Sequence, residues 1–250
     1  MIDAELKRLN ELALRAGHTG RVQYTRFLEP SMADAVRAAA NRAGVRAAFW
    51  GGYPEAERRV AAFYDADPPD PEEYPLTALR MEWNAKFAHP AHRDLLGALM
   101  GLGIERETTG DIAMGDWRGG ECAYLFALRE MADYIAAGLE SAGRASLRLS
   151  LADETPALRP PEGEMLRVTV QNERLDAVLA AGCRLSRSEA QRLIAAGLVK
   201  LNHVPNLHAD ARLVEGDLIS ARGFGRLRVQ ALQGESRRGR QVVLLFRYGK

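Results

Sequence analysis

Residues 174–202 constrain the fold of this chain more than any other feature. They contain two short amphipathic segments and then a segment in which apolar and polar residues alternate. In the first segment, residues 174–179, apolar side chains recur at helical spacing, so a short helix can bury one face. In residues 198–202 apolar and polar side chains alternate, as in a strand that points Lys200 and Asn202 outward. The pattern predicts helices packed on one face of a small sheet.

The second amphipathic segment predicts a helix that begins at Ser186. Ser186 and Glu189 fit a capping box, in which each side chain satisfies a backbone amide of the first helical turn. Gly197 is typical of the position just beyond a helix end. Four polar side chains then share the exposed side of the helix: Arg187, Ser188, Gln191 and Arg192.

Arg187 is an unusual residue for the first turn of a helix, because a cation there opposes the helix dipole. A docked phosphate would reverse that effect, and the free amides of a helix start form a natural anion site. The alternative is that Arg187 simply extends into solvent. In the preceding helix, Asp176 is expected to serve the helix start, where an acidic side chain is favoured.

The basic residues are concentrated near the end of the sequence. Residues 174–250 contain 14 Lys and Arg against 6 Asp and Glu, a net charge of +8, whereas the whole chain carries only +1. Within this region, Arg222 and Arg226 stand among glycines that permit close backbone approach. We therefore expect the helices and the sheet to form one basic edge that binds a partner rich in phosphates.

The same residues resemble the S4 RNA-binding domain. The matching elements are Arg174-Leu175-Asp176, Leu185-Ser186-Arg187-Ser188-Glu189-Ala190, Leu193-Ile194, Gly197-Leu198-Val199 and Gly216-Asp217. The rest of the chain is similar to the YlmH family, through Phe27-Leu28-Glu29-Pro30, Gly51-Gly52-Tyr53, His92-Arg93-Asp94-Leu95-Leu96-Gly97, Gly101-Leu102-Gly103-Ile104, Gly110-Asp111-Ile112 and Arg222-Gly223-Phe224-Gly225-Arg226. The resemblance extends through residues 234–240, although Leu227 stands where relatives often have an aromatic.

The resemblance implies a non-enzymatic RNA-binding factor of the large ribosomal subunit. In this family the S4 domain is thought to hold rRNA and tRNA during ribosome-associated quality control of stalled nascent chains, and an older association is with cell division. The expected RNA contacts are Arg174, Ser186, Arg187, Ser188, Gln191, Arg192, Lys200, Asn202, Arg222 and Arg226. Because such contacts read backbone and shape, we expect little preference for linear sequence.

The chain is expected to have an α+β fold with three domains: a small α/β unit over residues 1–70, a ferredoxin-like, RRM-like domain over 75–152, and an S4 domain over 168–250. Residues 65–75 and 153–166 are rich in proline and acidic residues, as linkers are. The first unit should contain a helix over 1–16 that stops at Gly17, a helix over 32–41 between Ser31 as N-cap and Gly44, and a strand over 60–64.

Residues 76–151 predict the order strand, helix, strand, strand, helix, strand, at 76–83, 92–102, 109–114, 123–128, 131–141 and 145–151. Many domains with this fold bind RNA by stacking bases on the sheet, and many bind none. Tyr124 and Phe126 are the only aromatics in the central strands, and we expect both to lie in the core.

Several other classes of protein are disfavoured. No stretch is apolar enough to span a membrane, and the acidic start is unlike a signal peptide, so a cytoplasmic location is expected. Cys122 and Cys183 are too few and too far apart for zinc, and no cofactor, metal, small-molecule substrate or catalytic residue is expected. Two alternatives stay open: an RNA-modifying enzyme that uses the S4 domain as its handle, and a cell-division adaptor whose acidic N-terminal body docks a protein.

Overall fold

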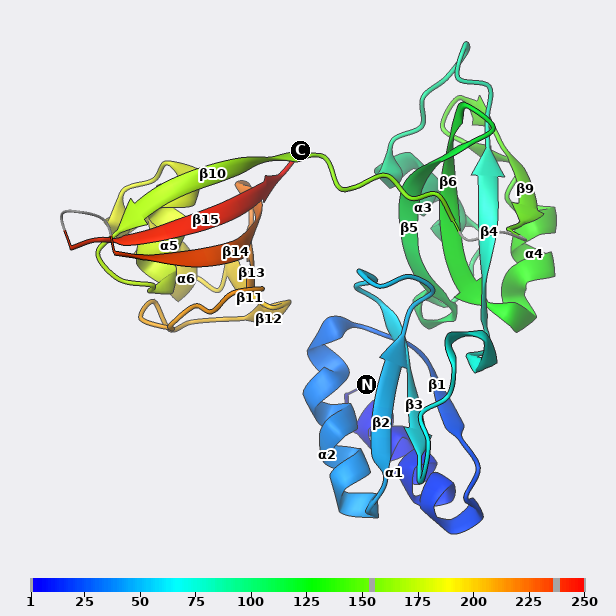
Figure 1. The fold of residues 1–250 in the computed structure, drawn as a ribbon. Coiled ribbons are helices and arrows are strands. Elements are labelled where there is room, and N and C mark those ends of the chain that lie inside the picture. Colours follow the sequence, from blue (N-terminus) through cyan, green and yellow to red (C-terminus); the bar gives the residue numbers. More distant parts are fainter. Residues whose placement is uncertain (1, 153–155, 236–238, 250) are drawn as a thin grey trace. The chain divides into compact units, whose positions relative to one another are not determined.

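The structure is a computed structural model that describes residues 2–152, 156–235 and 239–249. The chain forms two compact units, Met1–Arg159 and Pro160–Lys250, and each is described by itself (Figure 1). Helices and antiparallel sheets occur in both units, as the predicted α+β class requires. None of the helices in the described ranges combines the length and apolar character needed to cross a bilayer.

The first unit begins with a three-stranded antiparallel sheet covered on one face by two helices. Its elements are α1 (Ile2–Thr19), β1 (Gln23–Leu28), α2 (Ala33–Ala43), β2 (Arg46–Trp50) and β3 (Arg59–Tyr64), and the strand order is β1-β3-β2. Small side chains line the helical face: Ala13, Ala16, Ala39 and Ala40 pack against Ala61 and Phe63. This small-residue core lets both helices lie close to the sheet.

Two helix boundaries in this part differ from the prediction. Helix α1 continues through Gly17, because tertiary packing overrides the weak helix propensity of glycine. Gly17 lies close to Val45: a Cβ added to it would be 3.2 Å from the Val45 side chain. Helix α2 is preceded by a 3₁₀ turn, Pro30–Met32, which contains Ser31, so Ser31 is not the N-cap. Gly44 ends α2 in a left-handed conformation (φ 70°), as predicted.

The central part of the first unit has the predicted order of strands and helices. It contains β4 (Leu76–Glu82), α3 (His92–Gly101), β5 (Thr109–Trp117), β6 (Gly120–Leu128), α4 (Ala132–Gly138) and β9 (Arg148–Leu151), and its antiparallel sheet has the order β5-β6-β4-β9. This is the ferredoxin-like arrangement. Helix α4 ends earlier than predicted, because a small hairpin of β7 (Ser141–Ala142) and β8 (Ala145–Ser146) occupies the following residues.

The two sheets of the first unit pack against each other. The helix-free face of the central sheet buries Tyr124 and Phe126, at 2% and 1% exposure, in a cluster that also contains Phe27 and Val60 from the first sheet. The prediction that both aromatics belong to the core is confirmed. The face on which RRM-type domains stack bases is therefore covered by protein in this chain.

Residues 156–159 also pack on this face. Leu158 forms a β-bridge with Gly115 and belongs to the same cluster, while Arg159 pairs with Asp116 and Glu121. The prediction of a linker over 153–166 is thus wrong for residues 156–159, and residues 153–155 lie outside the described ranges.

The second unit is a six-stranded antiparallel sheet with two short helices on one face. Its elements are β10 (Gly163–Val170), α5 (Leu175–Cys183), α6 (Arg187–Ala195), β11 (Val199–Leu201), β12 (Val204–Pro205), β13 (Leu218–Ala221), β14 (Gly225–Glu235) and β15 (Gln241–Tyr248), and the strand order is β10-β15-β14-β13-β11-β12. Leu175, Leu179 and Ile194 from the helices pack against Val199, Val229 and Leu245 from the strands. The predicted helices and their buried stripes are confirmed.

Four strands of this sheet are additions to the predicted fold. Strand β10 begins at Gly163, inside the predicted linker, and β12 is a two-residue strand that pairs with β11. Strands β14 and β15 form a long hairpin that begins in the arginine-rich, glycine-rich stretch. Residues 236–238, part of the stretch that carries the family resemblance, lie outside the described ranges.

Candidate nucleic-acid interface

A buried carboxylate organises the basic residues at the start of α5 and α6. The Asp176 side chain has 0% exposure. It accepts hydrogen bonds from Arg174 Nε at 3.2 Å, from Arg187 Nε at 3.0 Å and from Gln191 Nε2 at 2.7 Å. These four residues, named the Asp176 cluster below, bring together three of the predicted RNA contacts, Arg174, Arg187 and Gln191.

The electrostatics of the cluster keep Asp176 ionised. Burial raises the pKa of this carboxyl group, but the hydrogen bonds from Arg187, Arg174 and Gln191 outweigh burial and lower the pKa to about 2. One carboxylate therefore faces two guanidinium groups, which leaves a net positive charge. The Arg174 and Arg187 side chains are 36% and 44% exposed, so each is held from beneath while its outer part faces solvent.

This arrangement suits recognition of phosphate. A guanidinium group has five N–H donors in a rigid plane, so one edge can bind Asp176 while the others stay available. The side chains are ordered before a ligand arrives, which reduces the entropy lost on binding. The sequence allowed two situations for Arg187: a side chain that extends into solvent, or one that binds a phosphate at the helix start. The structure differs from both, because Arg187 donates hydrogen bonds to Asp176.

The start of α6 is capped as predicted. The Ser186 N–H donates to Glu189 Oε2 at 2.8 Å, and the Glu189 N–H donates to Ser186 Oγ at 3.2 Å. The Ser186 hydroxyl also donates to Glu189 Oε2, at 2.6 Å, and lies 3.1 Å from Ser188 Oγ. The carboxylate of Glu189 thus takes one amide of the predicted anion site, and Ser186 acts within the helix start.

The remaining predicted contacts lie elsewhere on the unit. Arg192 is exposed one turn further along α6, and Arg222 is exposed in the turn after β13. Asn202 holds a turn, since its amide donates to Asp217 Oδ1 at 2.7 Å and accepts from the Leu218 N–H at 2.9 Å. Lys200 lies on the side of β11 away from the helices, because its neighbours in the strand pack into the core.

Lys200 and Arg226 share one row of the sheet. Lys200 pairs with Ser220 on β13, and Ser220 pairs with Arg226 on β14, so both basic side chains are on the helix-free face. The Asp176 cluster is on the helical side of the same unit. The predicted residues therefore lie on two faces and do not form the single basic edge that was expected. Strand alternation sends Lys200 and Arg226 away from the helices.

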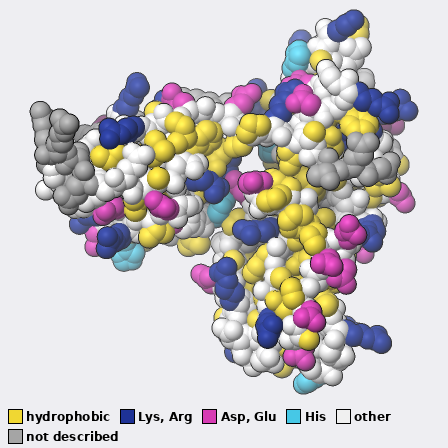
Figure 2. Space-filling view, in the orientation of Figure 1, with side chains coloured by type: hydrophobic (Ala, Val, Ile, Leu, Met, Phe, Trp, Pro, Cys, Tyr) yellow, Lys and Arg dark blue, Asp and Glu magenta, His cyan; other side chains and the backbone are white. Residues whose placement is uncertain are grey.

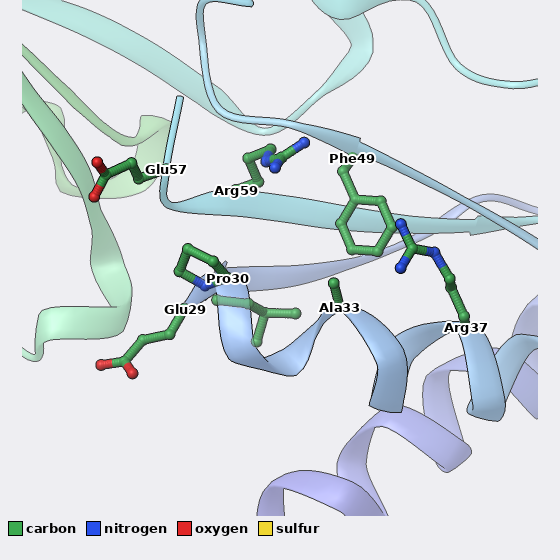
Figure 3. Close-up of a pocket in the computed structure, with 8 residues that line it drawn as sticks. Glu29, Pro30, Ala33, Arg37, Phe49, Glu57 and Arg59 are labelled. Atoms are coloured by element: carbon green, nitrogen blue, oxygen red, sulfur yellow. The ribbon is translucent and has the colours of Figure 1, made fainter. Parts of the chain in front are cut away.

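A hollow in the first unit is too small for a cofactor or a nucleotide. It has a volume of about 40 Å³ and is lined by Leu28, Glu29, Pro30, Ala33, Arg37, Phe49, Glu57 and Arg59 (Figure 3). The Arg37 guanidinium lies 5.7 Å from the centre of the Phe49 ring, which fills much of this side. Within the described residues, no group of three or more His, Cys, Asp and Glu side chains is arranged to hold a metal ion.

Models of known protein families match three successive parts of the chain. The YlmH N-terminal model matches residues 3–67, the model for the putative RNA-binding domain in YlmH matches 69–155, and the S4 domain model matches 173–219. The S4 match includes the whole Asp176 cluster.

Two relatives match much of this chain. The chain is 35% identical over 229 residues to the ribosome-associated protein quality control protein P2 of Bacillus subtilis (strain 168). The aligned region covers 91% of this chain and 88% of the relative. A solved structure of the cell division protein ylmH from Streptococcus pneumoniae covers 61% of this chain and 92% of its own, with 20% identity and a TM-score of 0.48. On the family models and the Bacillus relative, this chain belongs to the YlmH family, with an S4 domain near its C-terminus.

Proposed function

We propose that this chain is a non-enzymatic factor that binds structured rRNA and tRNA on the large ribosomal subunit during ribosome-associated quality control. The observation that carries the proposal is the Asp176 cluster, in which a buried acid holds Arg174 and Arg187 ready for a phosphate. The name of the Bacillus relative supports the ribosomal setting. Residues 168–250 are the RNA-binding domain in this proposal, and residues 1–70 and 75–152 form the body that presents it.

The mode of binding follows from the chemistry of the cluster. Contacts from arginine to phosphate carry no information about the bases, so recognition through them depends on the shape of the folded RNA. Gln191 donates to Asp176 and thereby fixes the spacing between α5 and α6, from which Arg174 and Arg187 respectively extend. Tyr124 and Phe126 are buried on the covered face of the central sheet, so no base can stack on them.

The same geometry disfavours a base-modifying role for Asp176. The triplet Arg174-Leu175-Asp176 resembles the catalytic Arg-Leu-Asp of pseudouridine synthases, in which an aspartate works on the base. Here the Asp176 carboxylate is fully buried and accepts from three donors, so a base cannot approach it without breaking the cluster. Asp176 instead acts on RNA through the arginines it holds.

The salt dependence of binding tests the proposal. Affinity of the full chain for a tRNA transcript should fall steeply with salt, and Arg187→Gln/Arg192→Gln should reduce the slope of log K against log salt by about 1.4 to 1.8, because each phosphate contact contributes about 0.7 to 0.9. Arg15→Gln/Arg21→Gln, which removes the same charge from exposed positions in the first unit, is the matched control. An unchanged affinity and slope in the Arg187/Arg192 variant would contradict the proposal.

A further inference from the structure

A groove lies at one end of the central sheet of the first unit. Its wall is formed by the end of β4, the loop that follows β4, the start of β6 and the chain between β8 and β9. Its volume is about 550 Å³, within the usual range for ligand sites. Figure 1 shows the loop after β4 extending beyond this end of the sheet, and Figure 2 shows basic and hydrophobic side chains at the tip of that loop.

The two acidic side chains that line the groove are both held by basic residues. Glu82 Oε1 accepts a hydrogen bond from Arg80 Nε at 2.8 Å, and Glu121 Oε1 accepts one from Arg159 Nη1 at 2.9 Å. His89 Nδ1 lies 3.1 Å from the other carboxylate oxygen of Glu121. Hydrogen bonds with His89 and Arg159 lower the pKa of Glu121. Both carboxylates therefore have their charge balanced by neighbours within the protein.

Four other side chains of the groove are hydrogen-bond donors that are exposed to solvent. They are Asn84, Lys86, Ser146 and Arg148. None of their donor groups reaches an acceptor among the residues that the structure describes. Arg148 stands opposite Glu82 across β9 and β4, but the Glu82 carboxylate binds Arg80. Lys86 and Arg148 thus give the groove two positive charges that no described carboxylate pairs with.

A buried donor also belongs to the wall of the groove. Trp83 is half-buried against the core of the central domain, and its indole Nε1 is buried with no acceptor among the described residues. Buried donors in folded proteins nearly always have an acceptor. The unpaired groups of this wall are therefore donors throughout, which favours a ligand that brings acceptors.

The loop after β4 is shaped by Asn84. Its side-chain Oδ1 accepts a hydrogen bond from the Lys86 N–H at 3.0 Å, and its backbone oxygen accepts one from the Phe87 N–H at 3.0 Å. The resulting turn carries Lys86 next to Phe87, whose side chain is 85% exposed. The turn therefore presents a flat apolar ring beside a positive charge.

The chemistry of the groove fits a strand of RNA better than a peptide. Phosphate oxygens only accept hydrogen bonds, which suits a wall whose unpaired groups are donors. A peptide brings a backbone N–H group with almost every carbonyl, and the carboxylates of the groove are already held by Arg80 and Arg159. Unpaired RNA also brings bases, which stack on exposed aromatic rings.

We propose that this groove binds a single-stranded segment of RNA, with phosphates held by Lys86 and Arg148 and a base stacked on Phe87. The inference rests on the proposed RNA-binding function and adds a contact in a part of the chain that otherwise only presents the S4 domain. The groove lies at the end of the central sheet, so this contact does not need the face on which Tyr124 and Phe126 are buried.

Salt dependence tests the phosphate contacts. For the full chain and an unstructured RNA of about 12 nucleotides, Lys86→Gln/Arg148→Gln should reduce the slope of log K against log salt by about 1.4, because each phosphate contact on a single strand contributes about 0.7. Arg15→Gln/Arg21→Gln, at exposed positions of the same unit, is the matched control and should leave the slope nearly unchanged. A slope that is the same in both variants would overturn the proposal.

The base contact is tested at the exposed ring. Phe87→Leu should weaken binding of the same RNA about fivefold and leave binding of an abasic strand of equal length and charge unchanged, because only bases stack. Tyr134→Leu, at an aromatic on α4 that is 55% exposed, is the control and should have no effect. Equal behaviour of the two strands in the Phe87 variant would contradict the stacking contact.

A competition experiment identifies the source of the nucleotide. A nucleoside monophosphate at the same concentration as the strand should not displace it, because the open groove holds a strand through several weak contacts. Displacement at equal concentration would show a site for a small nucleotide and would overturn the proposed RNA contact.

The two proposals fail in different ways. Arg187→Gln/Arg192→Gln should leave the effect of Phe87→Leu on the unstructured RNA in place. Lys86→Gln/Arg148→Gln should in turn leave the effect of the Arg187/Arg192 variant on the tRNA slope in place. If only the tRNA effect is missing, the Asp176 cluster is not a binding site. If only the effects at Lys86, Arg148 and Phe87 are missing, the groove proposal alone is overturned.

Discussion

At the scale of single residues, Asp176 has the most consequential role in the second unit. Sequence reasoning placed it correctly at the start of a helix, in the first turn of α5. Its actual partners are two, eleven and fifteen positions away, at Arg174, Arg187 and Gln191. Arg174 is the N-cap of the same helix, whereas Arg187 and Gln191 reach Asp176 only through the packing of α5 on α6, so their spacing along the chain carries no signal for the pairing. The predicted importance of Arg187 was recognisable because its position opposes the helix dipole.

Replacement of Asp176 distinguishes its role in positioning Arg174 and Arg187 from its effect on the net charge of the protein. Asp176→Asn makes the protein more positive, so simple charge attraction predicts tighter RNA binding. We expect the opposite, roughly fivefold weaker binding of the tRNA transcript, because Arg174 and Arg187 lose their fixed orientation. Fluorescence anisotropy at fixed salt measures this. Affinity equal to or above that of the wild type would show that the cluster does not organise the site.

The pH dependence of stability provides a second readout for the same variant. The pKa of Asp176 is about 2 in the folded chain, below its ordinary value near 4, so the ionised form stabilises the fold by about 2 kcal/mol at neutral pH. That contribution is present above pH 4 and is lost as the pH falls towards 2. Urea unfolding should show this loss in the wild type, and Asp176→Asn should be less stable at pH 7 and lack this part of the acid sensitivity.

At the scale of elements, the loop between β2 and β3 joins the two sheets of the first unit. Asp111 on β5 accepts hydrogen bonds from the Tyr53 hydroxyl at 3.0 Å and from the backbone N–H groups of Glu57 at 2.6 Å and Arg58 at 3.2 Å. The Tyr53 ring stacks on Phe126, with centres 5.0 Å apart. The family-resemblance segments Gly51-Gly52-Tyr53 and Gly110-Asp111-Ile112 thus meet in space and have a structural role.

Gly52 is the residue at which this contact is most sensitive. Its φ is +101°, and a Cβ there would lie 2.1 Å from the Phe126 ring. Gly52→Ala should therefore lower the free energy of unfolding by about 2 to 4 kcal/mol, through strain and overpacking. Gly97→Ala, in α3 with no atom within 4 Å of the new Cβ, should stabilise slightly and serves as the control. Equal stability of the two variants in urea unfolding would contradict this account of the loop.

The elements that could be predicted were those with local signals. The capping box at Ser186 and the buried stripes located α6 and α5, and the alternating order of the central domain located its sheet. Strand β14 was missed because arginines at alternate positions, such as Arg226 and Arg228, resembled a basic loop. The same alternation sends those arginines to the helix-free face of the sheet, so a strand interpretation would also have divided the basic residues correctly.

At the scale of the whole molecule, the charge separation along the chain agrees with a division of roles. The acidic first unit uses its central sheet face for internal packing, with Tyr124 and Phe126 buried. The basic residues are concentrated in the second unit, which contains the Asp176 cluster on its helical side and Lys200 and Arg226 on the helix-free face of its sheet. Composition alone predicted a basic RNA-binding end, but only the arrangement of strands and helices shows that its basic residues lie on two different faces.

The most direct test of the central claim is crosslinking of the full chain to RNA in living cells, followed by sequencing of the attached fragments. We predict that reads concentrate on large-subunit rRNA and tRNA, and that Arg187→Gln/Arg192→Gln lowers them relative to Arg15→Gln/Arg21→Gln at equal protein levels. Reads spread over messenger RNA, or enrichment on ribosomal RNA and tRNA that is the same in all variants, would contradict the account.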